Sequence, residues 1–79
     1  NIDLSRIKVL RIFKWLKSKK ISDQEMMRTF NCGIGFCLIA PKNNVDKIKK
    51  FFPRKYLPYE IGYISRNNKK INLSNSFRW

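Results

Sequence analysis

The chain has 79 residues, of which 43% are hydrophobic, and its 18 Lys and Arg against five Asp and Glu give a net charge of +13. This length allows one small domain, and six Phe, three Tyr and two Trp supply enough apolar surface to exclude a disordered chain. No apolar run approaches the roughly 20 residues of a membrane span. Two cysteines without histidine leave a tetrahedral zinc site incomplete. We therefore expect Cys32 and Cys37 to be free thiols in a cytoplasmic protein, with no metal site and no membrane partner.

The positive charge has two interpretations. One is a polyanionic partner such as nucleic acid. The other is compositional bias, because Lys, Asn and Ile have AT-rich codons and are abundant here. Surface lysine also accumulates easily because it stays hydrated. We favour the compositional interpretation and expect no specific nucleic-acid partner.

A first helix is predicted from Val9, Ile12, Phe13 and Leu16, which recur at the i, i+3, i+4 and i+7 spacing of one helical face. Trp15 lies beside this face. A basic amphipathic helix can pack on a protein core or lie on a membrane surface. We expect it to pack on the core, and the sequence after it, SKKIS, ends the pattern.

A second helix is predicted after Ser22, because Ser22 and Glu25 have the spacing of a capping box. In that motif the serine oxygen accepts from the Glu25 amide, and the glutamate reaches back to the Ser22 amide. The helix should end near Asn31. Its apolar residues are Met26, Met27 and Phe30.

Three strands and a third helix are predicted in the second half. Residues 34–40 are almost continuously apolar and stop at Pro41, which is typical of a strand buried on both faces. Asn44 is placed to cap a helix that carries Val45, Ile48 and Phe52. Residues 59–65 and 70–74 have the composition of strands, with a turn at Asn67 and Asn68 between them.

The resulting order is helix, helix, strand, helix, strand, strand. It fits an α+β fold, a small mixed β-sheet with helices packed on its faces. A strand buried on both faces needs more neighbours than this chain offers. We therefore expect the missing neighbours to come from another part of the same protein or from a second copy.

Two glycines separate the second helix from the predicted strand. Gly33 is suited to ending the helix, and Gly35 to a bulge or a close backbone approach. A dinucleotide-binding loop runs from strand through three glycines to helix. The order here is helix, loop, strand, so the pair does not indicate such a loop.

Residues 12–41, IFKWLKSKKISDQEMMRTFNCGIGFCLIAP, resemble the C-terminal domain of the aminoimidazole ribonucleotide synthetase family, also called phosphoribosylformylglycinamidine cyclo-ligase. The resemblance lies in a Phe-x-Trp-Leu helix and in the E-M-x-R-T-F-N-x-G-I-G segment at residues 25–35. It continues through VDKIKKFF and YEIGYI, and covers about residues 12–64. Phe36 stands where the family usually has methionine, an exchange that keeps the position apolar.

The resemblance implies that residues 1–79 are the latter part of the C-terminal domain, a fragment of that fold without the ATP-binding N-terminal domain. The full-length family enzyme is a ligase of purine biosynthesis that uses ATP and magnesium. It activates the amide oxygen of formylglycinamidine ribonucleotide; an internal nitrogen attacks, phosphate leaves and the imidazole ring closes. This chain has no glycine-rich phosphate loop and no paired magnesium-binding carboxylates. We expect it to contain no catalytic residue, to bind neither cofactor, to be inactive alone and to form a homodimer.

The substrate-binding residues implied within this segment are Arg28, Thr29, Asn31, Gly33 and Gly35. Arginine offers a bidentate fork for phosphate, Thr and Asn offer neutral polar groups, and glycine allows close approach. A structural interpretation stays open for two of them. Arg28 would then pair with an acidic neighbour, and Asn31 would only cap the helix end.

The alternative function is a basic nucleic-acid-binding module. The densest basic run is Lys47, Lys49, Lys50, Arg54 and Lys55. A single-strand binder needs exposed aromatic side chains on which bases stack. The aromatic residues expected to be buried instead are Phe13, Trp15, Phe30 and Phe52.

Overall fold

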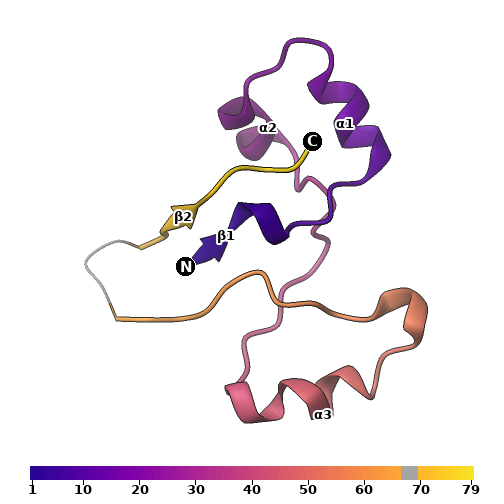
Figure 1. Cartoon of the computed structure of the whole chain (residues 1–79), viewed down its shortest axis with the longest axis vertical. Coiled ribbons are helices and arrows are strands. Elements are labelled where there is room, and N and C mark those ends of the chain that lie inside the picture. Colours follow the sequence, from indigo (N-terminus) through magenta and orange to yellow (C-terminus); the bar gives the residue numbers. More distant parts are fainter. Residues whose placement is uncertain (67–69) are drawn as a thin grey trace.

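The computed structural model describes residues 1–66 and 70–79, so the predicted turn at Asn67 and Asn68 lies outside the described residues. The α-helices and β-strands are β1 (Ile2–Asp3), α1 (Arg11–Lys17), α2 (Asp23–Thr29), α3 (Val45–Lys49) and β2 (Leu73–Ser74). Three 3₁₀ helices connect them, namely η1 (Leu4–Arg6), η2 (Lys42–Asn44) and η3 (Arg54–Tyr56). In Figure 1, α1 and α2 lie at one end of the molecule with the C-terminal tail, and α3 lies at the other end.

The sheet brings together residues from the two ends of the sequence. β1 and β2 are parallel, with Ile2 opposite Leu73 and Asp3 opposite Ser74. On its other side, Ile2 forms an isolated antiparallel bridge with Gly62. The pairing is therefore mixed, and together with the three helices it confirms the predicted α+β class.

The strands themselves differ from the prediction. Of the expected strand at residues 59–65, only Gly62 makes a bridge, and of residues 70–74 only the last two form β2. Both segments pair with β1, which the sequence pattern did not indicate because two residues show no periodicity. A side chain at Gly62 would place its Cβ 1.8 Å from the Asn1 carbonyl oxygen, so this pairing requires glycine.

The core is small and draws on both ends of the chain. Its buried residues are Leu4, Ile7, Met26, Cys32 and Phe77. Met26 is fully buried, and the tail is fixed over α2 by a hydrogen bond of 2.9 Å from Trp79 Nε1 to Asp23 Oδ1. Apolar side chains from η1, α2 and the tail thus exclude water together.

The strand predicted at residues 34–40 is absent. This segment has no regular secondary structure, and Phe36 and Ile39 are 83% and 80% exposed. An apolar run becomes a doubly buried strand only when neighbouring strands lie on both of its edges. None of the described residues occupies those positions, so the prediction was wrong for this chain.

The two outer helices follow the prediction only in part. On α1, Phe13 and Leu16 pack against the core as expected, whereas Ile12 and Trp15 are each 55% exposed. α3 forms as predicted, but the Asn44 side chain makes no capping hydrogen bond. Phe52 is 38% exposed after the end of that helix. The apolar faces predict the helices correctly, but they do not predict which part of each face finds a partner.

Candidate functional site

The helix α2 carries the first two predicted site residues and is formed by local sequence signals. The Ser22 hydroxyl accepts a hydrogen bond of 3.2 Å from the Glu25 amide, which confirms the serine half of the capping box. The Glu25 carboxylate accepts instead from the Thr29 hydroxyl at 3.0 Å, one helical turn later. Acidic residues in the first turn and Arg28 in the last also suit the helix dipole.

A tight turn follows α2 and places the remaining site residues. Asn31 begins the turn and accepts two hydrogen bonds within it. Its Oδ1 accepts from the Gly33 amide and its carbonyl oxygen from the Ile34 amide, each at 3.0 Å. Both central residues have positive φ, 53° at Cys32 and 115° at Gly33. A turn with two such residues favours glycine, and a Cβ at Gly33 would lie 3.0 Å from the Lys8 carbonyl oxygen.

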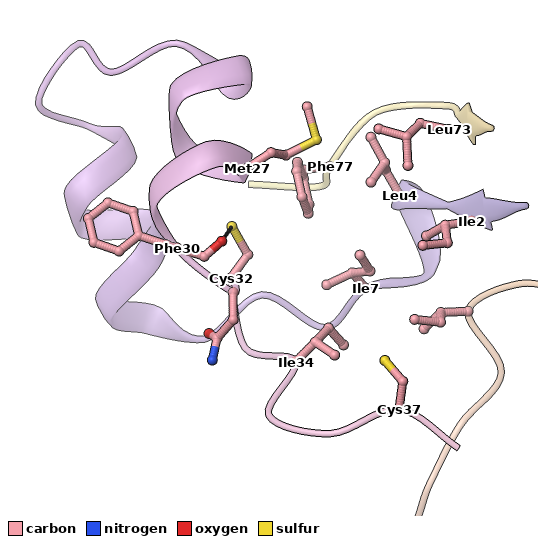
Figure 2. Close-up of a pocket in the computed structure, with 12 residues that line it drawn as sticks. Ile2, Leu4, Ile7, Met27, Phe30, Cys32, Ile34, Cys37, Leu73 and Phe77 are labelled. Atoms are coloured by element: carbon pink, nitrogen blue, oxygen red, sulfur yellow. Dashed lines mark hydrogen bonds between the residues drawn. The ribbon is translucent and has the colours of Figure 1, made fainter. Parts of the chain in front are cut away.

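Cys32 is the anchor of this turn. Its side chain is 1% exposed, and its Sγ lies 3.9 Å from the Met26 carbonyl oxygen and 3.8 Å from that of Phe30. The contact with Phe30 is the dashed line in Figure 2. Burial raises the pKa of the Cys32 thiol, and the Asp23 carboxylate raises it further. Cys32 therefore acts as a small apolar residue that fixes the turn under the helix, not as a nucleophile.

An apolar pocket of about 200 Å³ opens beside the turn. Figure 2 shows Ile34 and Cys37 on the loop that follows α2, across the pocket from Leu4 and Leu73. Among its lining residues, Asn31 is the single polar side chain. Without a set of convergent polar groups, this pocket offers hydrophobic contact and no evident chemistry.

The predicted site residues do not share one cavity. Asn31 lines the apolar pocket and Gly33 lines a second, basic cleft. Arg28 and Thr29 are exposed at the end of α2 and line neither cavity. Gly35 lines neither, and a Cβ added to it would meet no atom within 4 Å, so the close approach expected at Gly35 was wrong.

The structure gives different outcomes for the structural roles considered for Arg28 and Asn31. Arg28 pairs with no carboxylate in the part of the chain that the structure describes, so the ion-pair interpretation was wrong. Asn31 has a structural bond, but in the turn after the helix and not as the expected cap of the helix end, where Phe30 is the C-cap residue. The Asn31 amide nitrogen is not used in that turn.

The basic cleft has a volume of about 530 Å³, and Gly33 is part of its lining. It is lined by Lys8, Leu10, Gly33, Lys49, Arg54, Lys55, Leu57, Pro58 and Tyr59. Three cations of the predicted basic run are present, but Lys8 and Tyr59 were not foreseen. They are 51 residues apart in sequence, and the Lys8 amide donates to the Tyr59 hydroxyl at 3.0 Å. Only the three-dimensional structure brings them together.

The aromatic residues give a mixed result. Phe13 and Phe30 pack against each other with ring centroids 5.9 Å apart, as their predicted burial implies. Trp15 and Phe52 are exposed, contrary to prediction, because no part of the described chain covers α1 and α3 on those sides.

Two kinds of feature, a metal-binding cluster and a membrane-spanning helix, are not found among the described residues. Nowhere in residues 1–66 and 70–79 do three side chains of His, Cys, Asp or Glu form a group that could hold a metal ion. None of the helices in this part of the chain is long and apolar enough to cross a membrane.

Comparison with known proteins places this segment in a family. Residues 1–72 match the family described as AIR synthase related protein, C-terminal domain. A phosphoribosylformylglycinamidine cyclo-ligase of Prochlorococcus marinus (strain NATL1A) is 36% identical over 74 residues, which cover 89% of this chain and 21% of that protein. One of Lactobacillus helveticus (strain DPC 4571) is 35% identical over 82 residues, 98% of this chain and 24% of that protein.

The chain thus spans between 21% and 24% of the length of these relatives. No solved structure matches it significantly. The capped helix α2 and the glycine turn after it fall inside the matched residues. The chain belongs to the family of AIR synthase related proteins, through its match to their C-terminal domain.

Proposed function

We propose that this chain is part of the C-terminal domain of a phosphoribosylformylglycinamidine cyclo-ligase. The observation that carries the proposal is the match of residues 1–72 to the family, together with relatives that bear this name. In the proposed reaction the amide oxygen of formylglycinamidine ribonucleotide takes the γ-phosphoryl group of ATP. The internal nitrogen then attacks the activated carbon, and the oxygen leaves with phosphate as the ring closes.

The part assigned to this chain is one wall of the substrate cleft. The Arg28 guanidinium is exposed and unpaired among the described residues, so its fork is available to a phosphate. The Asn31 Oδ1 is used in the turn, which leaves the amide nitrogen of this exposed residue to donate to a ribose or amide oxygen. The Thr29 hydroxyl donates to the Glu25 carboxylate and so helps to fix the end of α2. At Gly35 the space around the backbone is open, which lets a ligand approach it.

ATP and magnesium belong, in this proposal, to the part of the enzyme outside this chain. The described residues supply no set of carboxylates for magnesium. The isolated chain is then inactive. Exposed apolar side chains such as Phe36, Ile39 and Phe51 favour its self-association, most simply as a homodimer. The proposed location is the cytoplasm, where purine nucleotides are made.

A chimera tests the function. The matching C-terminal segment of the Prochlorococcus marinus relative is replaced by this chain, and ATP-dependent ring closure is measured with formylglycinamidine ribonucleotide. Turnover above buffer, and growth of a purine auxotroph that lacks the cyclo-ligase, are expected. A chimera that folds and binds ATP without any turnover would contradict the proposal.

Variants of the chimera test the site separately. Arg28→Ala should raise KM or lower kcat by about tenfold or more, the loss expected for one charge-assisted contact, and Asn31→Ala by about threefold to tenfold, the loss expected for one neutral hydrogen bond. Arg66→Ala and Asn43→Ala remove exposed side chains of the same types outside the motif, and should leave both constants unchanged. Unaltered kinetics in the first pair would contradict the site and leave the family function standing.

A further inference from the structure

The basic cleft is lined by positively charged side chains that form no ion pair with any described residue. Lys8, Lys49, Arg54 and Lys55 line it, and no carboxylate does. The ion pairs among the described residues are Arg6 with Asp3 and Lys17 with Asp23, so none of the four cations is paired. Four like charges around one cleft repel each other, and a bound anion would relieve that repulsion.

The cleft is also built from separate segments rather than along one. Lys8 comes from the segment before α1, Lys49 from the end of α3, and Arg54 from η3. Tyr59, which follows η3 in the chain, contacts the Lys8 segment, because its hydroxyl accepts from the Lys8 amide and its ring lies 4.7 Å from the Lys8 Nζ. Lys49 is half-buried, whereas Lys47 and Lys50 beside it are exposed.

One wall is apolar, formed by Leu10, Leu57 and Pro58. The volume of about 530 Å³ lies within the range of small-molecule sites, about 300–1,000 Å³. A long polyanion would instead need a track of charge with open aromatic rings. Lys47 and Lys50 of the same run do not line the cleft, and Lys8 covers the ring of Tyr59.

From this arrangement we propose that the basic cleft is a binding site for a small phosphorylated ligand. Its phosphate groups contact Lys8, Lys49, Arg54 and Lys55, and its less polar body lies against Leu10, Leu57 and Pro58. The site is distinct from the cluster at Arg28 and Asn31, and it does not depend on the cyclo-ligase proposal.

Pyrophosphate is the first probe, titrated into the 79-residue chain at about 150 mM salt, where long-range attraction between exposed charges is largely screened. Amide NMR shifts report the site. Saturable binding is expected, with shifts at Gly33 and in α3 and η3. Ribose 5-phosphate in a second titration distinguishes a phosphomonoester from a diphosphate. A failure of both probes to saturate would overturn the proposal.

Two double variants distinguish binding in the cleft from non-specific attraction by the positive charge of the protein. The double variant Lys49→Gln/Arg54→Gln should weaken pyrophosphate binding about tenfold or more, since each residue gives a charge-assisted contact. The double variant Lys47→Gln/Lys50→Gln removes the same charge from the same run outside the cleft, and should leave the affinity within about twofold, as expected for exposed charges that are screened.

Equal losses in the two double variants would overturn the proposal. So would tight binding of single-stranded RNA that pyrophosphate does not displace, because this would favour a nucleic-acid partner. Circular dichroism of each variant confirms that the fold is retained. Activity of the chimera is not involved, so failure here and failure of the proposed function are separate outcomes.

Discussion

The two ends of the molecule in Figure 1 differ in how far their apolar side chains are buried, although both are rich in apolar residues. We call residues 1–34 with 70–79 the anchored region, and residues 36–60 the α3 region. All five buried core residues lie in the anchored region. In the α3 region, which the structure describes throughout, no residue is buried, although it is rich in apolar side chains.

The difference follows from long-range contacts. In the anchored region, hydrogen bonds join residues more than 50 positions apart, such as Trp79 with Asp23 and Asn75 with Asp3. In the α3 region the bonds between backbone groups outside the helix are local, for example Phe51 with Ile48, and the long-range bond from the Lys8 amide to Tyr59 lies at its far end in sequence. An amphipathic helix forms from its own sequence, but its apolar face is buried only where another segment covers it.

The strongest test of this contrast is truncation of one apolar side chain in each region. Met26→Ala should lower the free energy of unfolding by about 2–5 kcal/mol, because Met26 is 0% exposed and truncation leaves a cavity. Phe51→Ala, at 85% exposed, should change it by less than about 0.5 kcal/mol. Urea unfolding measures both. A large loss for Phe51→Ala would show that self-association buries the α3 region.

A second comparison uses the two glycines that flank Ile34. Gly33→Ala should cost about 1–3 kcal/mol, because the residue has φ 115° and its new Cβ would lie 3.0 Å from the Lys8 carbonyl oxygen. Gly35→Ala, with open space around it, should be neutral or slightly stabilising. Equal losses in thermal unfolding would contradict the turn geometry described here.

The helix caps give a smaller effect. Ser22→Ala should cost about 1 kcal/mol, since it removes the bond to the Glu25 amide. Asn44→Ala should cost much less, because the Asn44 side chain caps nothing at α3. Helix content by circular dichroism and the urea midpoint should fall only for Ser22→Ala, and an equal fall for both variants would argue for an unseen cap at α3.

The smallest expected effect is a dependence on pH that arises at Asp3 in β1. Its pKa is lowered from 3.8, chiefly by the hydrogen bond from the Ser5 hydroxyl and then by that from Asn75. A lowered pKa stabilises the fold above pH 3.8, and this contribution is lost as the pH falls below it. Asp3→Asn should therefore flatten part of the acid limb when the free energy of unfolding is plotted against pH.

What the sequence predicts well is local. α2 and its serine cap depend on residues three or four apart, and the bond from the Glu25 amide to Ser22 was predicted correctly, whereas the predicted return bond to the Glu25 carboxylate was wrong, because that carboxylate accepts from Thr29. Cys32 and Cys37 form no disulfide with each other, and the structural role of buried Cys32 was missed. The signal that could have indicated this role is that cysteine is one of the residue types most often fully buried in proteins.

What the sequence does not predict is non-local pairing. The apolar run at residues 34–40 was read as a strand, yet strand formation depends on neighbours that a pattern does not contain. The same limit applies to the basic cleft. Lys49, Arg54 and Lys55 stand out in the sequence, whereas Lys8 joins them only through its bond to Tyr59.

The pairing of β1 with β2 has a consequence for the order of folding. Asn1 and Asn72 are hydrogen-bonded across 71 positions, so during synthesis β1 cannot pair until β2 has left the ribosome. At about 5–20 residues per second, that wait lasts several seconds. During it the capped helix α2 and the turn at Asn31 can form from local contacts, while Leu4 and Ile7 wait for Phe77 to complete their packing. The nascent chain therefore presents uncovered apolar residues until β2 and Phe77 have been made, which is the interval in which a chaperone would protect it.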